Sequence, residues 1–183
     1  KTALTTNATS NLFVVIIVSQ NMMAWCTVKS ATMLMGKYQK ADDTCGLYKF
    51  MDCIFCKITE GSISSNKIWE NENFFAFLDI KPLQKGHLLL VPKKHVEEVF
   101  DLHHDLYSEL FAIAKKIATP LRQAMQSKKV GLVVEGFGVA HAHLHLIPIN
   151  NPHELNPDKA YSASKEELEE VQRALVTQIN KSV

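Results

Sequence analysis

The 183-residue sequence has little arginine and almost no charge imbalance. Arg122 and Arg173 are its only arginines, so backbone N–H groups or histidines would have to bind the anionic groups of a ligand, in place of an arginine cluster. The formal net charge is +1, which argues against strong electrostatic attraction to nucleic acids or membrane surfaces. We therefore expect neither nucleic acid nor membrane among its partners.

Cysteines and long apolar runs are also scarce. The four cysteines are too few, in a chain of this length, for a fold built on disulfides. The apolar run at residues 12–18 is too short to span a membrane as a helix. Hydrophobic residues make up 46% of the sequence and charged residues 21%, a composition typical of a globular domain with a sizeable core.

Residues 1–50 differ in pattern from the rest of the chain. They start at Lys1 instead of methionine, and much of the stretch shows no sustained helical or strand period. A signal peptide with residues 12–18 as its apolar centre stays an alternative, although Lys1 alone is a thin basic beginning and no clear cleavage site follows promptly. We predict that Met51 is the native start and that residues 1–50 are a poorly ordered or artefactual extension. A domain over residues 51–150 and a C-terminal tail and helix over residues 151–183 would follow.

From residue 51 onward the hydrophobic pattern is regular. Period-two apolar stretches bounded by turn residues predict five strands, at residues 67–70, 74–79, 87–92, 130–135 and 141–147. Apolar residues at spacings of three and four predict a long helix between the third and fourth strands, and a last helix from about residue 164 to 180. This order, β-β-β-α-β-β-α, favours an α+β fold with a mostly antiparallel sheet.

The fifth predicted strand carries the most informative pattern in the sequence. His141, His143 and His145 alternate with apolar residues, so on a strand they would share one face while the apolar residues enter the core. A row of imidazoles could bind a metal ion or a chain of phosphates. Two other interpretations stay open on the pattern alone: a zinc-hydrolase site of three histidines, and histidines without a function.

Four stretches together resemble a known family. They are residues 53–58, 76–80, 86–95 and 141–148. These stretches resemble the histidine-triad (HIT) nucleotide hydrolases and transferases of bacterial type, and they occur in the same order as in that family. The resemblance covers about residues 51–150. It implies a five-stranded, mostly antiparallel sheet with a long packed helix, a homodimer, and a pocket for a purine nucleotide or nucleotide conjugate. It also implies a cytoplasmic protein without an organic cofactor.

The resemblance also implies catalytic roles for the three histidines. His143 would be the nucleophile that attacks the α-phosphorus, flanked by His141 and by His145, which would help to hold the phosphate. Imidazole suits this chemistry because its ordinary pKa, about 6.5, leaves much of it neutral near physiological pH. The implied activity is hydrolysis of nucleoside phosphoramidates or dinucleoside polyphosphates through a nucleotidyl-histidine intermediate. Nucleotidyl transfer to another acceptor, or a nucleotide-binding regulatory module with little turnover, are the alternatives.

Further positions match the family's nucleotide-binding residues or the loop beside them. The expected residues are Asp79, Ile80, Gly136, Gly138 and Val139. Asp79 would accept hydrogen bonds from the ribose hydroxyls. Many members carry polar Asn, Gln and Ser side chains in the loop before the triad, whereas this chain has Glu135 near the Asn position. Because a carboxylate beside a polyphosphate is unfavourable, the leaving-group preference stays open.

The C-x-x-C motif of Cys53 and Cys56 is ambiguous by itself between zinc, redox chemistry and chance. We judge a thioredoxin-like role weak, because the motif is expected to precede turns and strands instead of opening a helix. In some HIT proteins this pair completes a structural zinc site with two histidines, which correspond to His95 and His141 here. Two thiolates and two imidazoles form a chemically sensible tetrahedral site. His87 is expected to be a packing or supporting residue.

Overall fold

The computed structural model describes residues 12–19, 22–29 and 53–179, and the chain divides into one unit at Lys1–Tyr48 and a second at Lys49–Val183. In the first unit, strands β1 (Leu12–Ser19) and β2 (Met22–Lys29) form an antiparallel pair. The other residues up to 52 lie outside the described residues, so the extension over residues 1–50 stays a prediction. Within the described part of the chain, no helix is both long enough and apolar enough to cross a membrane.

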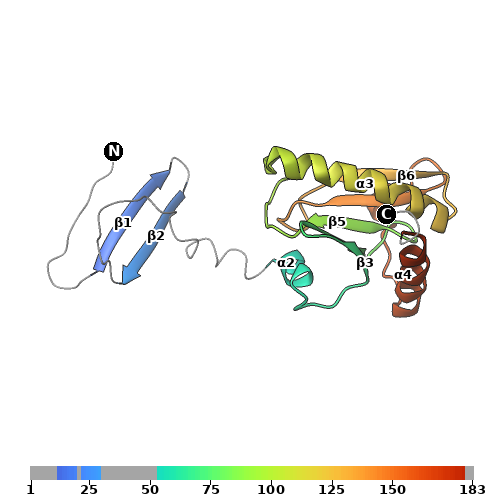
Figure 1. Ribbon diagram of the computed structural model, residues 1–183, viewed down its shortest axis with the longest axis horizontal. Coiled ribbons are helices and arrows are strands. Elements are labelled where there is room, and N and C mark those ends of the chain that lie inside the picture. The colour runs from blue at the N-terminus through green and yellow to red at the C-terminus, as the bar shows by residue number, and fades with distance from the viewer. Residues whose placement is uncertain (1–11, 20–21, 30–52, 180–183) are drawn as a thin grey trace. The chain divides into compact units, whose positions relative to one another are not determined.

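The second unit contains a five-stranded antiparallel sheet in the order β3-β4-β5-β7-β6 (Figure 1). Its strands are β3 (Lys67–Glu70), β4 (Phe74–Leu78), β5 (Leu88–Pro92), β6 (Lys129–Val134) and β7 (Leu144–Ile149). Its α-helices are α2 (Ile54–Thr59), α3 (His104–Ala124) and α4 (Lys165–Ile179). The predicted α+β fold with a long helix and a C-terminal helix is therefore confirmed.

The neighbouring strands β4 and β5 are buried at every position, because both faces of the sheet are covered there. On one face, Leu90, Leu144 and the residues that alternate with them pack under helices α3 and α4. Helix α3 contributes Leu110, Ile113 and Ile117 to this core, at the predicted spacings of three and four. On the other face, a smaller apolar cluster lies beneath helix α2.

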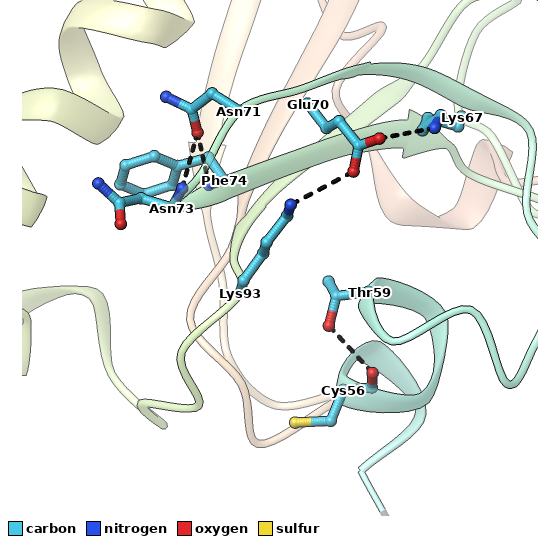
Figure 2. Close-up of polar contacts among 8 residues, drawn as sticks. All are labelled: Cys56, Thr59, Lys67, Glu70, Asn71, Asn73, Phe74 and Lys93. Atoms are coloured by element: carbon cyan, nitrogen blue, oxygen red, sulfur yellow. Dashed lines mark hydrogen bonds and ion pairs between the residues drawn. The ribbon is translucent and has the colours of Figure 1, made fainter.

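Helix α2 corrects the expectation that the C-x-x-C motif does not open a helix. Cys53 is its N-cap residue, and Cys56 lies within it. Phe55 and Ile58 are buried against the sheet, so tertiary packing stabilises a helix too short to show a periodic pattern. At its end, the Thr59 Oγ1 hydroxyl donates to the Cys56 carbonyl at 3.0 Å (Figure 2).

The Asn71 side chain stabilises the β3–β4 turn. The Asn71 Oδ1 atom accepts hydrogen bonds from the backbone N–H groups of Asn73 at 3.0 Å and Phe74 at 2.7 Å (Figure 2). This Asx turn reverses the chain in the predicted place. Beside it, Glu70 forms an ion pair with Lys93 at 3.3 Å, which ties the edge strand β3 to the end of β5.

Strand β7 begins later than predicted. The histidine alternation predicted a strand from His141, but β7 starts at Leu144, so His141 and His143 precede it. Upstream of β7 the Ala142 N–H donates to the Val96 carbonyl at 2.6 Å instead of to a sheet neighbour. The chain diverges from the sheet here, although Ala142 still enters the core as expected.

The segment after β7 is fastened across the sheet edge. The backbone N–H groups of Tyr161 and Ala163 donate to the carbonyls of Pro82 and Ile80 at 3.2 and 3.1 Å. The Ser164 Oγ atom then accepts from the Glu167 N–H at 3.2 Å, the predicted N-terminal cap of α4. These contacts hold the segment beside the loop that follows β4.

The central strand offers a direct test of the fold. Leu90 in β5 is fully buried between α3 and the neighbouring strands. We expect Leu90→Ala to lower the free energy of unfolding by about 2–5 kcal/mol, because it removes buried methyl groups and leaves a cavity. Urea unfolding measures this change. Ile63→Ala, at a position 37% exposed in the loop after α2, is the control and should cost well under about 1 kcal/mol; equal losses would contradict the assignment of the core.

Candidate functional site

Four side chains from three parts of the second unit converge beside helix α2. The ligand atoms of Cys53, Cys56, His95 and His141 all lie within 4.8 Å of one another. The Cys56 Sγ atom is 3.2 Å from His95 Nδ1 and 3.5 Å from His141 Nδ1, and Cys53 Sγ is 3.3 Å from His141 Nδ1. Ligands around a tetrahedral zinc ion are separated by about 3.6 Å, given metal–ligand bonds of about 2.0–2.3 Å. The cluster therefore has the donor set and size that zinc requires.

The surroundings of the cluster orient its ligands. His141 is fully buried, and its Nε2–H donates to the Pro92 carbonyl at 2.8 Å, which leaves the Nδ1 lone pair directed at the two sulfurs. Burial lowers the pKa of His141 to about 4, which keeps the imidazole neutral as a metal ligand must be. Burial, together with the hydrogen bond that the Cys56 thiol makes with Cys53, raises the pKa of the Cys56 thiol to about 12. A bound cation would supply the positive charge that the thiolates need.

His143 is held by the backbone just upstream. Its Nδ1–H donates to the His141 carbonyl at 2.6 Å, so the lone pair of the neutral ring is on Nε2. The side chain is 5% exposed, and the Phe55 ring lies against it edge-on, with centroids 5.2 Å apart. A single nucleophilic nitrogen on an immobilised ring is what attack on a phosphorus atom requires.

His145 is linked to a buried histidine that sequence reasoning treated only as a supporting residue. The Leu83 N–H donates to His87 Nδ1 at 3.1 Å, so the His87 proton is on Nε2. This Nε2–H donates to His145 Nδ1 at 2.8 Å, which in turn places the His145 proton on its own Nε2. The chain of hydrogen bonds thus makes His145 a neutral donor. No spacing in the sequence indicated it, because the two histidines are 58 residues apart.

The electrostatic environment keeps both of these rings neutral. Burial lowers the pKa of His87 to about 4, although the charge of Asp79, 3.7 Å away, acts in the opposite direction. Burial and the charge of His143 also lower the pKa of His145, against the effect of Asp79 and Glu135. Because both imidazoles are neutral, one can donate a hydrogen bond to the other without charge repulsion, in agreement with the 2.8 Å distance between His87 Nε2 and His145 Nδ1.

This depressed pKa predicts a pH dependence of stability. Between pH 6.5 and 4 an unfolded histidine takes up a proton while folded His87 does not, so the free energy of unfolding should fall as pH falls through this range. The His87 contribution is about 3 kcal/mol at most. Urea unfolding of wild type and His87→Gln at both ends of the range measures it, because the difference between the two cancels the other histidines. Parallel pH profiles would contradict the prediction.

A zinc-hydrolase site of three histidines is not supported. Among the described residues, two groups bring three or more possible ligand atoms together: the cluster around Cys56, and Asp79 with His87 and His145. Neither contains all three triad histidines. His141 belongs to the first group and His145 to the second, with His143 in neither.

The predicted nucleotide-binding residues do not line a single cavity. Asp79 lines a cavity of about 190 Å³ with His87, His145 and Glu135. Gly138 and Val139 line another cavity, of about 330 Å³, which is also lined by Cys53 and His95 of the Cys/His cluster. Ile80 is 65% exposed next to Asp79. Gly136 precedes these two residues in the loop, close to the Glu98 carboxylate.

Comparisons with known proteins agree with this geometry. The family model described as HIT domain matches residues 60–151, half of the chain. The Protein hit of Bacillus subtilis is 39% identical over 104 residues, covering 53% of this chain and 70% of that protein. The adenosine 5'-monophosphoramidase hnt1 of Schizosaccharomyces pombe is 35% identical over 103 residues, covering 55% and 77%.

A solved structure shows the same likeness at the level of the fold. The crystal structure of a Zn-bound histidine triad family protein from Mycobacterium smegmatis aligns with a TM-score of 0.62 at 28% identity, covering 72% of this chain and 96% of that one. The family model, the relatives and the solved structure point to the same family. The chain belongs to the HIT domain family.

Proposed function

We propose that the protein cleaves nucleoside phosphoramidates or dinucleoside polyphosphates at the α-phosphate, with His143 as the nucleophile. The observation that supports this most is the 2.6 Å hydrogen bond from His143 Nδ1 to the His141 carbonyl. It fixes the tautomer in which Nε2 carries the reactive lone pair, and it stabilises the positive charge that the ring acquires on attack. The name of the Schizosaccharomyces pombe relative, an adenosine monophosphoramidase, supports the same chemistry.

The reaction has two steps. The His143 Nε2 lone pair forms a bond to the α-phosphorus, and the bond from phosphorus to the leaving group breaks. The leaving nitrogen or oxygen departs with the electron pair and, where it needs one, takes a proton from solvent. Water then attacks the nucleotidyl-histidine, the phosphorus–Nε2 bond returns its electrons to His143, and the remaining proton of the water goes to solvent.

His145 would stabilise the charge on the phosphoryl oxygens. The hydrogen bond from His87 places a proton on His145 Nε2, so the ring donates without being charged. Backbone N–H groups of Gly136, Gly138 and Val139 would add further donors, since small residues allow close approach. His141, bound to the zinc cluster, acts through its carbonyl and is a positioning residue.

Purine nucleosides would bind beside the loop that follows β4. The Asp79 Oδ1 atom accepts from the Lys81 N–H at 2.8 Å, which orients the carboxylate for the ribose hydroxyls. Ile80 offers an exposed apolar surface to the base.

Zinc would be structural. Bound by Cys53, Cys56, His95 and His141, it would fasten helix α2 to the chain that carries His143. The Zn-bound relative supports this role, as do the geometry and burial of the four ligands. Thiols kept free for zinc suit the reducing cytoplasm, where we expect the protein.

The homodimer implied by the family resemblance stays part of this proposal. Strand β6 is at the edge of the sheet, with Leu132 and Val134 exposed on it. Exposed apolar side chains on an unpaired edge favour pairing with a second copy.

Incubation with adenosine phosphoramidate and with diadenosine polyphosphates tests the proposed reaction. We expect release of AMP from at least one of them, and a covalent nucleotide on His143 when the reaction is quenched in acid-free denaturant. Transfer of the nucleotide to an added acceptor would favour the transferase alternative. Nucleotide binding without any AMP release would favour a regulatory module and overturn the proposal.

A further inference from the structure

The cavity that contains His145 extends beyond the triad toward the edge strand β6. Asp79 and His87 line it on the β4–β5 side, and Val133 and Glu135 on the β6 side, with His145 between them. A nucleoside on Asp79 and a phosphate at the triad therefore leave the β6 side of the cavity for the group beyond the phosphate. We propose that this cavity is the leaving-group subsite, and that Glu135 makes it selective for amine leaving groups that carry a second, protonated amine. This inference rests on the proposed function.

The outer wall of the subsite comes from the segment after β7. Leu155, Pro157 and Ala160 line the cavity opposite the sheet. Leu155 reaches the sheet because residue 131 is glycine: a Cβ added there would lie 2.7 Å from Leu155 Cδ2, closer than atoms can pack. The bond from the Tyr161 N–H to the Pro82 carbonyl fixes the end of the segment. The wall is therefore a built part of the fold.

The lining combines apolar surface with negative charge. Val133, Ile147 and the residues of the outer wall form an apolar surface suited to methylene groups. The charged residues that line the cavity are Asp79, Lys81 and Glu135. Lys81 follows Asp79 on the β4 side, where the nucleoside would bind, so Glu135 is the only charge lining the cavity on the β6 side. An ammonium group there would be attracted, and a carboxylate or phosphate repelled.

The size of the cavity fits a leaving group better than a nucleotide. Its volume of about 190 Å³ is below the 300–1000 Å³ typical of pockets that enclose drug-sized ligands. Part of this volume lies beside Asp79, where the nucleoside would bind, so the part on the β6 side suits a small leaving group such as a short aliphatic diamine. Cleavage breaks the phosphorus–nitrogen bond, and the electron pair of this bond leaves with the nitrogen. The nitrogen then takes a proton from solvent, so that the released product is the free diamine. The distal ammonium group takes no part in the bond changes.

Three adenosine phosphoramidates of similar length but different charge test the proposal. The leaving amines are putrescine, pentylamine and γ-aminobutyrate, whose distal groups are a cation, a methyl group and an anion. We expect wild-type kcat/KM to fall in this order, with putrescine favoured over pentylamine by about 5- to 10-fold, the size of one partly exposed ion pair. Glu135→Gln should abolish this preference and leave pentylamine cleavage within about twofold of wild type. Added salt should reduce the preference in wild type alone.

A matched control distinguishes a specific contact with Glu135 from the general electrostatic effect of carboxylates near this loop. Glu98→Gln removes a carboxylate that also lies close to Gly136 but does not line the cavity, so the preference should persist. A preference unchanged by Glu135→Gln, or lost equally in Glu98→Gln, would overturn the subsite. Failure of wild type to cleave even the pentylamine compound would instead contradict the proposed function.

Discussion

His143→Ala should release AMP from adenosine phosphoramidate at least about 1000-fold more slowly than wild type, because it removes the atom that forms the covalent intermediate. The substitution should spare the binding of AMP, since the proposed nucleoside contacts of Asp79 are elsewhere. The expected result is therefore a loss in kcat with little change in nucleotide affinity. Steady-state kinetics together with calorimetric titration of AMP measures both.

The same position allows a sharper test of the nucleophile. His143→Gly leaves space for free imidazole, which should restore part of the AMP release in proportion to its concentration if the ring is the attacking group. His104→Ala, at an exposed histidine at the start of α3, is the matched control and should retain wild-type activity. Thermal unfolding shows whether each variant is folded. Full activity in a folded His143→Ala protein would disprove the mechanism.

The sequence predicted the elements of the second unit because their periodic patterns are long. Helix α3 and the strands of the sheet follow from apolar spacings that tertiary packing reinforces. Helix α2 was missed because six residues carry no period, and it is stabilised by packing against residues such as Phe75 and Phe77 that are distant in the sequence. The start of β7 was placed three residues early, because alternation does not reveal where strand pairing ends.

The site was predictable only in part, for a similar reason. The family resemblance indicated that Cys53, Cys56 and His141 are ligands of one zinc ion, and the distances between their sulfur and nitrogen atoms agree with it. The contact between His87 and His145 depends on the register of β5 against β7, which pairs Leu89 with His145 and so places His87, two residues earlier, diagonally from His145. Register is a property of the folded sheet, and the hydrophobic pattern of a single sequence does not specify it.

The zinc cluster predicts the largest change in stability. Cys56→Ser should abolish stoichiometric zinc binding and lower the thermal midpoint by at least about 10 °C, because the proposed metal would hold helix α2 against the chain upstream of β7. Removal of zinc from wild type with a chelator should have the same effect. Elemental analysis gives the zinc content, and calorimetry or circular dichroism gives the midpoint.

The effects of Cys56→Ser and of the chelator on the thermal midpoint should not be additive, and this is the decisive part of the test. If the chelator acts at this cluster, it should lower the midpoint of wild type but leave that of Cys56→Ser unchanged. Cys26→Ser exchanges the same residue types in β2, within the other unit, and should behave as wild type in both measurements. Retention of one zinc by Cys56→Ser would show that the ion is bound elsewhere. A midpoint insensitive to chelation would show that the fold depends on Cys56 packing alone, because only a bound metal links the chelator to the stability of this helix.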